Sequence, residues 1–153
     1  MVRVKILNHK PTEQIEQICQ RRGVRLTPQR RAVFELICQS NKASSAYELL
    51  EQLQKSEPQA KPPTVYRALE FLLEQGFVHR VESTNSYISC CLSHESQHVF
   101  QLLICDRCGY VEELHDDSLT AQLNVNAKQH QFHLTKQVIE SHGICQDCYT
   151  SEK

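Results

Sequence analysis

The amino-acid sequence predicts an α+β protein in which helices and a β-hairpin come first and a small α/β unit follows. Three observations support this prediction. Helix-capping signals and apolar residues at helical spacing fill the first half of the chain. Short β-rich runs begin after Gly76. Two Cys-x-x-Cys pairs lie in the second half. A length of 153 residues is compatible with one domain or with two small ones.

Four helices are expected in the first half, each with a recognisable start or stop signal. Thr27 can cap the second helix, with Pro28 at its first position. Ser45 to Glu48 is a capping box that opens the third. Lys61-Pro62-Pro63 is expected to break the chain before the fourth. The expected helices are Thr12–Arg22, one from Thr27-Pro28, one from Ser45, and one from Thr64 to about Gln75.

A β-hairpin is expected directly after the fourth helix. Phe77–Val81 and Tyr87–Cys90 are typical of short strands, and Ser83–Ser86 is a polar turn between them. Helices followed by such a hairpin are typical of a winged helix-turn-helix, in which the third and fourth helices read DNA and the hairpin is the wing. The same shape also serves as a protein-interaction module, so the pattern alone leaves both uses open.

The fourth helix shows a buried face and a polar first turn. Apolar side chains recur from Val65 to Leu73, whereas Thr64, Tyr66 and Arg67 lie in the first turn. Arg67 could contact a guanine or a phosphate, and Tyr66 could touch a thymine methyl group. We therefore expect these three residues to face DNA, the alternative being that they are polar residues on a solvated helix.

Charge is distributed unevenly along the chain. Residues 1–85 contain 13 Lys/Arg and 9 Asp/Glu, a net of +4, whereas residues 86–153 contain 4 and 9, a net of −5. The overall net charge of −1 conceals this difference. It suggests a first half that can approach a polyanion and a second half that cannot.

The second half is expected to be a small α/β unit of about 60 residues. Leu119 and Leu123 are expected to point inward from its helix. The expected elements are strands at Val99–Cys105, Tyr110–Leu114 and Phe132–Glu140, and a helix capped by Asp116-Asp117 and running to about Gln129. So small a unit is usually stabilised by a metal or by a second copy. A homodimer that reads palindromic DNA is therefore expected.

The two Cys-x-x-Cys pairs are the most specific motif in the chain. They are Cys105-Asp-Arg-Cys108 and Cys145-Gln-Asp-Cys148. Two such pairs can supply four thiolates to one Zn²⁺, which prefers tetrahedral sulfur ligation. Gly109 can adopt a positive φ and let backbone amides point back at the sulfurs. The alternatives are two disulfides or a redox-active pair. Two Cys-x-x-Cys pairs, each of which we call a knuckle, favour a zinc site over both alternatives. A closed cage of this kind stabilises a fold and performs no chemistry.

A second group of candidate metal ligands lies near the junction of the two halves: His79, Cys90, His98 and Glu113, with Cys91, His94 and His115 close by in the sequence. A mixed nitrogen, sulfur and oxygen set suits Zn²⁺, and the thiolate disfavours Mg²⁺ or Ca²⁺. Ligands drawn from both halves would form a clasp whose occupancy fixes the angle between them. The alternative is that these are unrelated polar residues on the surface. The wide and irregular spacing of the residues does not distinguish a metal site from this alternative.

Composition predicts a cytoplasmic protein. Residues 1–10 contain no apolar h-region, and nowhere do 18 apolar residues run together, so we expect no signal peptide and no membrane span. In the reducing cytosol, eight cysteines indicate metal more than disulfides. No nucleophile–base pair or phosphate-binding loop is visible, and an enzyme is not predicted.

Five segments, in order over nearly the whole chain, resemble the ferric uptake regulator family: Leu26–Arg30, Pro63–Leu69, Gly76–His79, Cys105–Gly109 and Gly143–Cys148. Within that family, Pro58–Arg67 and Glu82–Tyr87 are similar to the zinc uptake regulator branch. The short run Ser93–His98, in place of a His-rich segment, and a cysteine at position 90 also fit that branch.

The resemblance implies a dimeric repressor that binds operator DNA when loaded with two Zn²⁺ per chain and silences zinc-uptake genes. By position, Cys105, Cys108, Cys145 and Cys148 match the family's structural zinc site. His79, Cys90, His98 and Glu113 match its regulatory site. Tyr66 and Arg67 match residues of the recognition helix, and Arg30 matches a family arginine whose role is left open.

Two domains joined by a hinge are expected. Residues 1–89 would form the DNA-binding domain with its wing, 90–98 a hinge, and 99–153 the dimerisation and metal-binding domain. No small-molecule substrate other than zinc is expected. A ferric-sensing or peroxide-sensing repressor on the same fold is the alternative function.

Overall fold

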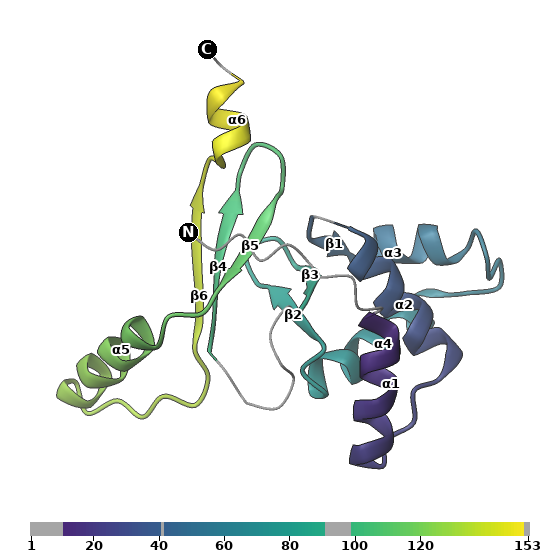
Figure 1. The fold of residues 1–153 in the computed structure, drawn as a ribbon, viewed down its shortest axis with the longest axis horizontal. Coiled ribbons are helices and arrows are strands. Elements are labelled where there is room, and N and C mark those ends of the chain that lie inside the picture. Colours follow the sequence, from purple (N-terminus) through teal and green to yellow (C-terminus); the bar gives the residue numbers. More distant parts are fainter. Residues whose placement is uncertain (1–10, 41, 91–98, 152–153) are drawn as a thin grey trace. The chain divides into compact units, whose positions relative to one another are not determined.

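The chain divides into two compact units, Met1–His94 and Glu95–Lys153, which we call unit 1 and unit 2 (Figure 1). The computed structural model describes residues 11–40, 42–90 and 99–151. Helices dominate unit 1 and a sheet dominates unit 2, which confirms the predicted α+β class. Within the described ranges, each helix is too short or too polar to cross a membrane.

The four helices predicted for unit 1 are all present. The elements of this unit are α1 Pro11–Arg22, α2 Pro28–Gln39, β1 Ser44–Ser45, α3 Ala46–Leu53, α4 Pro62–Glu74, β2 Val78–Val81 and β3 Ser86–Ser89. Thr27 caps α2 by accepting a hydrogen bond from the backbone N–H of Arg30. Ser45 and Glu48 form the predicted reciprocal capping box at α3. Local capping signals therefore identify helix starts correctly in two places.

The predicted start of α4 was wrong. We expected the two prolines to interrupt the chain and the helix to begin at Thr64, but α4 begins at Pro62 with Lys61 as its N-cap. The first N–H groups of a helix have no intrahelical partner, so proline is tolerated in the first turn. Thr64 is the third helical residue, and its Oγ1 accepts a hydrogen bond from the backbone N–H of Lys61 at 3.3 Å.

The predicted hairpin is the antiparallel pair of β2 and β3, with Val78 opposite Ser89 and Val81 opposite Ser86. A third strand, β1, pairs with the other edge of β3 and was not predicted. Its two residues are both serine, which carries no strand signal. The pairing attaches the N-terminus of α3 to the wing.

Unit 1 has a continuous apolar core. Nineteen buried residues form one cluster that draws on all four helices and on the hairpin. Phe34 of α2 and Phe77, just before β2, meet edge to face with 6.2 Å between ring centroids, a favourable aromatic geometry. The core fixes α2, α3 and α4 against one another and so determines the position of the N-terminal part of α4.

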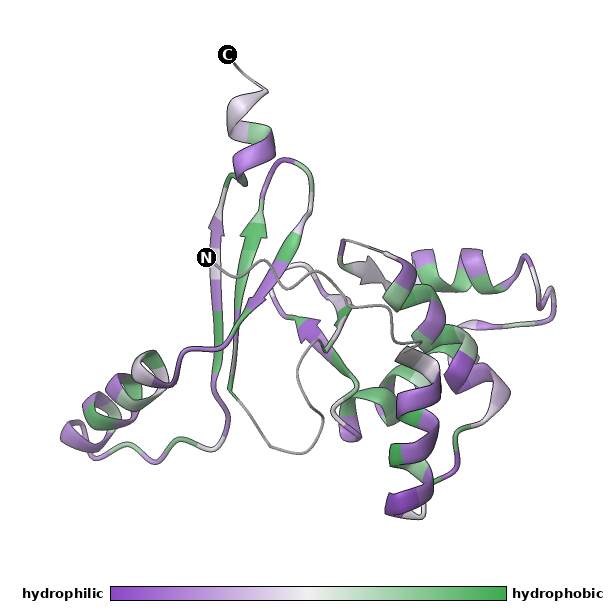
Figure 2. Cartoon of the chain, viewed as in Figure 1, coloured by the Kyte–Doolittle hydropathy of each residue, from purple (hydrophilic) through white to green (hydrophobic). Residues whose placement is uncertain are grey.

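Unit 2 is a three-stranded sheet with two helices. Its elements are β4 Phe100–Cys105, β5 Val111–Leu114, α5 Asp117–Gln129, β6 Val138–Gly143 and α6 Gln146–Thr150. β4 lies in the middle, antiparallel to β5 and parallel to β6. In Figure 2, β4 is largely green (hydrophobic), whereas β6 is largely purple toward its C-terminal end. The central strand therefore supplies most of the little apolar core that this unit has.

Two predictions for unit 2 were wrong, and α6 was not predicted. The expected strand at Phe132–Glu140 begins only at Val138, because Val138 pairs with Phe100 at the start of β4 and β4 offers no earlier residue. Leu119 and Leu123 were expected to point inward, but they are 46% and 38% exposed. α5 extends away from the end of the sheet (Figure 1) and contains no buried residue.

Candidate metal centres and nucleic-acid interface

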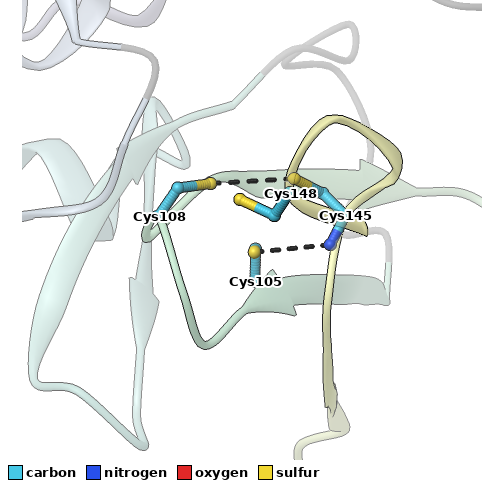
Figure 3. Close-up of side chains that lie close together, drawn as sticks. All are labelled: Cys105, Cys108, Cys145 and Cys148. Atoms are coloured by element: carbon cyan, nitrogen blue, oxygen red, sulfur yellow. Dashed lines mark hydrogen bonds between the residues drawn. The ribbon is translucent and has the colours of Figure 1, made fainter. Parts of the chain in front are cut away.

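The parallel pairing of β4 with β6 brings the two Cys-x-x-Cys pairs together. Parallel strands end at the same edge of a sheet. Cys105 is the last residue of β4 and lies opposite Gly143, the last residue of β6, so Cys145 follows two residues beyond. One sulfur from each of Cys105, Cys108, Cys145 and Cys148 lies within 4.8 Å of the others (Figure 3). The predicted four-cysteine cluster is confirmed.

The local geometry of this cluster suits a metal better than disulfides. The sulfurs of Cys108 and Cys145 are 3.7 Å apart, whereas a disulfide requires about 2.05 Å. All four cysteines carry free sulfurs. Gly109 adopts the predicted positive φ of 73°, and its N–H donates to the carbonyl of Cys105 at 2.9 Å. The N–H of Cys145 donates to the Cys105 sulfur at 3.3 Å, across the two knuckles.

The electrostatics of the cluster favour a bound cation. The N–H of Cys145, followed by that of Cys108, lowers the pKa of Cys105 to about 6. Desolvation, followed by hydrogen bonds among the thiols, raises the pKa of Cys148 to about 12. One thiolate is therefore stabilised by backbone donors while its neighbour resists ionisation. Four thiolates can coexist in so small a volume when a cation such as Zn²⁺ neutralises them.

Three polar side chains at the cluster were not predicted: Asp106, Arg107 and His142. The Nδ1 of His142 lies 2.7 Å from a carboxylate oxygen of Asp106, and Arg107 donates to the carbonyl oxygen of Cys148 at 3.0 Å. Asp106 and Arg107 lie between the cysteines of the first pair and His142 lies on β6, and no sequence spacing links these positions. Their polar character was the only available signal.

Three of the four predicted ligands of the second candidate metal group, His79, Cys90 and Glu113, lie in the described residues. His79 in β2 and Cys90 after β3 are both buried in unit 1, with a ring nitrogen and the sulfur within 4.8 Å of each other. The N–H of Cys90 donates to the carbonyl of Phe77 at 2.9 Å, which extends the hairpin ladder and fixes Cys90. Glu113 lies on β5 in unit 2. His98 lies outside the described residues.

The three alternative ligands have different positions. Cys91 and His94 lie outside the described residues. His115 is half-exposed in unit 2, and its Nε2 lies 3.3 Å from a carboxylate oxygen of Asp117. This contact with Asp117, just inside α5, gives His115 a role at the start of that helix.

The first two turns of α4 present the candidate DNA-reading residues. The side chain of Tyr66 is 57% exposed, and Arg67 is also exposed. Thr64 is half-buried and uses its hydroxyl to cap the helix. Thr64 and Arg67 border a hollow that is also lined by Thr27, the N-cap of α2, and by Arg30 in its first turn. Helix N-termini and guanidinium groups together favour phosphate.

Arg30, whose role the sequence left open, has a packing role. Its guanidinium lies over the ring of Phe71, 3.8 Å from the centroid, and its NH1 donates to the carbonyl of Arg25. The cation–π contact joins the start of α2 to α4. Arg30 therefore helps to hold the helix that carries Tyr66 and Arg67.

Comparison with known proteins gives consistent results. The model of the ferric uptake regulator family matches residues 21–148. A zinc uptake regulation protein of Escherichia coli (strain K12) is 52% identical over 139 residues, covering 91% of this chain and 81% of the relative. One of Mycobacterium tuberculosis (strain CDC 1551 / Oshkosh) is 32% identical over 129 residues, covering 82% and 95%. A solved zinc uptake regulator complexed with zinc and DNA has a TM-score of 0.89 at 51% identity, covering 92% of this chain and 94% of that one.

Proposed function

The chain belongs to the ferric uptake regulator family, and from this premise we propose that it is a zinc-responsive transcriptional repressor. It binds operator DNA as a zinc-loaded dimer and represses zinc-uptake genes. The observation that carries the proposal is the agreement, over 92% of the chain, with a zinc uptake regulator solved with zinc and DNA. The family consists of transcriptional regulators, and we infer that this protein is not an enzyme and works in the cytoplasm.

Each chain binds two Zn²⁺ in this proposal, and the first is structural. Cys105, Cys108, Cys145 and Cys148 supply a closed set of four sulfurs, which matches the tetrahedral preference of Zn²⁺. The ion neutralises the thiolates when bound. These residues thereby join β4 to the segment after β6, and the binding free energy contributes directly to the folding of unit 2.

The second Zn²⁺ is regulatory, with His79, Cys90, His98 and Glu113 as its ligands. The burial of His79 beside Cys90 supports this part of the proposal, since a ring nitrogen and a thiol within 4.8 Å can share one ion. A nitrogen, sulfur and oxygen set suits Zn²⁺. His79 belongs to the wing, so a ligand held there acts on the DNA-binding unit itself.

Regulation follows from differential affinity. A ligand shifts an equilibrium between two states only by the ratio of its affinities for them, and about 10⁴-fold turns 1:99 into 99:1. We infer that the DNA-competent state binds zinc more tightly than the other state. Operator DNA then tightens zinc binding by the same factor.

The DNA interface consists of Thr64, Tyr66 and Arg67, repeated by a second copy on a palindromic operator. The exposure of Tyr66 and Arg67 in the second turn of α4 supports their role. Residues 1–89 act as the DNA-binding domain, 90–98 as the hinge, and 99–153 as the dimerisation and metal-binding domain.

Cys90→Ser tests the proposal, because it removes the regulatory thiolate with little change in volume. The probe is double-stranded DNA selected from a random pool by the zinc-loaded parent protein. We expect parent protein to gain roughly 100-fold in affinity for this DNA when zinc is added, within the usual range of coupling free energies. Cys90→Ser should remain a folded dimer with one zinc per chain and gain less than about 5-fold.

Cys38→Ser is the matched control, because Cys38 is a half-buried cysteine of the same unit that belongs to neither proposed site. It should respond to zinc as the parent does. A parental response from Cys90→Ser would assign the site to other residues, with Cys91, His94 and His115 to be tested next. If the zinc-loaded parent selects no DNA, or if the purified protein carries iron, the zinc-responsive repressor is the wrong function.

A further inference from the structure

We propose that Asp106, Arg107 and His142 are positioning residues that hold the two cysteine knuckles at the separation a single zinc ion requires. The inference rests on the structural zinc site proposed above. Each of these residues lies outside the ligand set, and each makes a hydrogen bond from one knuckle, or the strand leading to it, to the other. The polypeptide itself thereby holds the sulfurs in register.

Asp106 is held to the end of β6 twice. Its backbone N–H donates to the carbonyl of Gly143 at 2.8 Å, which continues the parallel ladder one residue past Cys105. Its carboxylate lies 2.7 Å from Nδ1 of His142. The start of the first knuckle is therefore tied to the strand that leads to the second.

Arg107 makes the complementary contact at the far end of the second knuckle. Its NH1 donates to the carbonyl of Cys148 at 3.0 Å, in the five-residue helix α6. Arginine near a helix C-terminus satisfies carbonyls that have no intrahelical partner. The Asp106 contacts precede Cys145 and the Arg107 contact reaches Cys148, so the second knuckle is held on both sides.

These polar contacts matter because apolar packing at this edge is sparse. α6 contains no buried residue, and Ile144, between β6 and the knuckle, is 50% exposed. A zinc site tolerates only about 0.2 Å of error in its ligand distances. Residues that orient ligands from outside the ligand set typically change metal affinity 10–100-fold when lost. Hydrogen bonds between the knuckles can hold the four sulfurs at the distances that a zinc ion requires.

The experiment measures the rate of zinc release from the four-cysteine site. All variants are made in the Cys90→Ser background, so that the regulatory zinc does not contribute. Arg107→Met and His142→Leu remove the two side-chain contacts, whereas Arg107→Lys and His142→Asn each retain a donor near the original position. Lys128→Met is the matched control, since it removes an exposed cation from the same unit, on α5.

We expect zinc transfer to excess 4-(2-pyridylazo)resorcinol to be about 10-fold faster from Arg107→Met and His142→Leu than from Lys128→Met. Arg107→Lys and His142→Asn should restore most of the parental rate. The Co²⁺-loaded variants should show a weaker or shifted tetrahedral d–d absorption, a signature that simple loss of stability does not produce.

Release at the Lys128→Met rate from both Arg107→Met and His142→Leu, with parental Co²⁺ spectra, would overturn the inference. If Arg107→Met does not fold, the comparison of His142→Leu with His142→Asn decides by the same two measurements. A Cys90→Ser protein that folds without any zinc would instead refute the structural site itself, which is a failure of the proposed function.

Discussion

The two units of this chain are stabilised in different ways. Unit 1 has a core cluster of 19 buried residues, whereas the buried apolar residues described in unit 2 are Leu102, Ile104 and Cys105. Of the 11 exposed large hydrophobic residues in the described ranges, nine belong to unit 2. Unit 1 can therefore fold on its own apolar packing. Unit 2 is expected to depend on a bound metal for stability and on a partner to cover its exposed apolar residues.

This difference fits the division of tasks. A DNA-reading surface requires helices fixed within one rigid core, and unit 1 supplies it. A unit of about 60 residues whose apolar face is still open is well suited to bury that face against a second copy. Each prediction below perturbs one unit and asks whether the other is affected.

The largest effect is expected from Cys105→Ser, because the four-sulfur site contributes folding free energy of about 10 kcal/mol or more in small zinc domains. Loss of one ligand should unfold unit 2 and abolish dimerisation while unit 1 stays folded. Hydrogen exchange followed by mass spectrometry should show rapid exchange for residues 99–151 and protection for α2 to α4. Analytical ultracentrifugation should show a monomer.

Cys38→Ser, in unit 1, is the control for that experiment and should leave both units protected. A stable dimer from Cys105→Ser would show that unit 2 does not depend on the zinc cage. Loss of protection in unit 1 would show that its core is not self-sufficient, and the comparison between the units would fail.

A core truncation should produce the opposite pattern. Phe34→Ala deletes a ring that is 1% exposed and meets Phe77, and Phe-to-Ala changes in cores cost about 3–5 kcal/mol. Exchange protection should fall in α2 and α4 and remain in β4 and β6. Tyr47→Ala, at a side chain 69% exposed in the same unit, should change neither. Equal losses in both units after Phe34→Ala would mean that they fold as one.

A smaller effect is expected on the open face of unit 2. Leu123→Ala removes three carbon atoms from α5, each contributing about 0.8 kcal/mol when fully buried. Because Leu123 is 38% exposed, a second copy can bury only that part, so the loss is about 1 kcal/mol per protomer and about 2 kcal/mol per dimer. If a second copy covers α5, the dimer dissociation constant should rise roughly 30-fold or more in sedimentation experiments, with zinc content unchanged. Lys128→Ala on the same helix is the control. An unaltered dimer would place the interface elsewhere.

Local signals were enough to predict much of the fold and the four-cysteine cluster. Ser45 with Glu48 marks a helix start, and each Cys-x-x-Cys pair is complete within four residues. The errors arose where the answer depends on distant residues. β6 begins at Val138 because its partner strand β4 begins at Phe100, which pairs with Val138. Leu123 remains partly exposed because nothing within the described chain covers it. His98 is a predicted ligand that remains a prediction.

The smallest effect concerns the capping box of α3. It tests whether the two units lose stability at different pH values. The carboxylate of Glu48 accepts hydrogen bonds from the N–H and hydroxyl of Ser45, each at 2.7 Å. The backbone N–H, then the hydroxyl, holds the pKa of Glu48 below its ordinary value. A depressed folded-state pKa means that this stabilisation is present above the unfolded pKa and is lost as pH falls through the folded value. Ser45→Ala should cost about 1 kcal/mol at neutral pH.

Because Ser45→Ala deletes the hydroxyl but keeps the backbone N–H, the pKa of Glu48 should move only part of the way back to its ordinary value. Titration of the Glu48 carboxyl carbon by NMR measures this midpoint in parent and variant. As pH falls, protonation of the thiolates is expected to release zinc from unit 2 before the Glu48 carboxylate is protonated. The Glu48 titration is therefore followed in protein whose unit 2 is losing its metal. Unit 1 should keep its native resonances down to the Glu48 transition, because its core needs no metal. Identical Glu48 titration midpoints in parent and variant would show that the Ser45 hydroxyl does not contribute to the capping box. Collapse of the unit 1 resonances together with zinc loss would show that the two units are not independently stabilised.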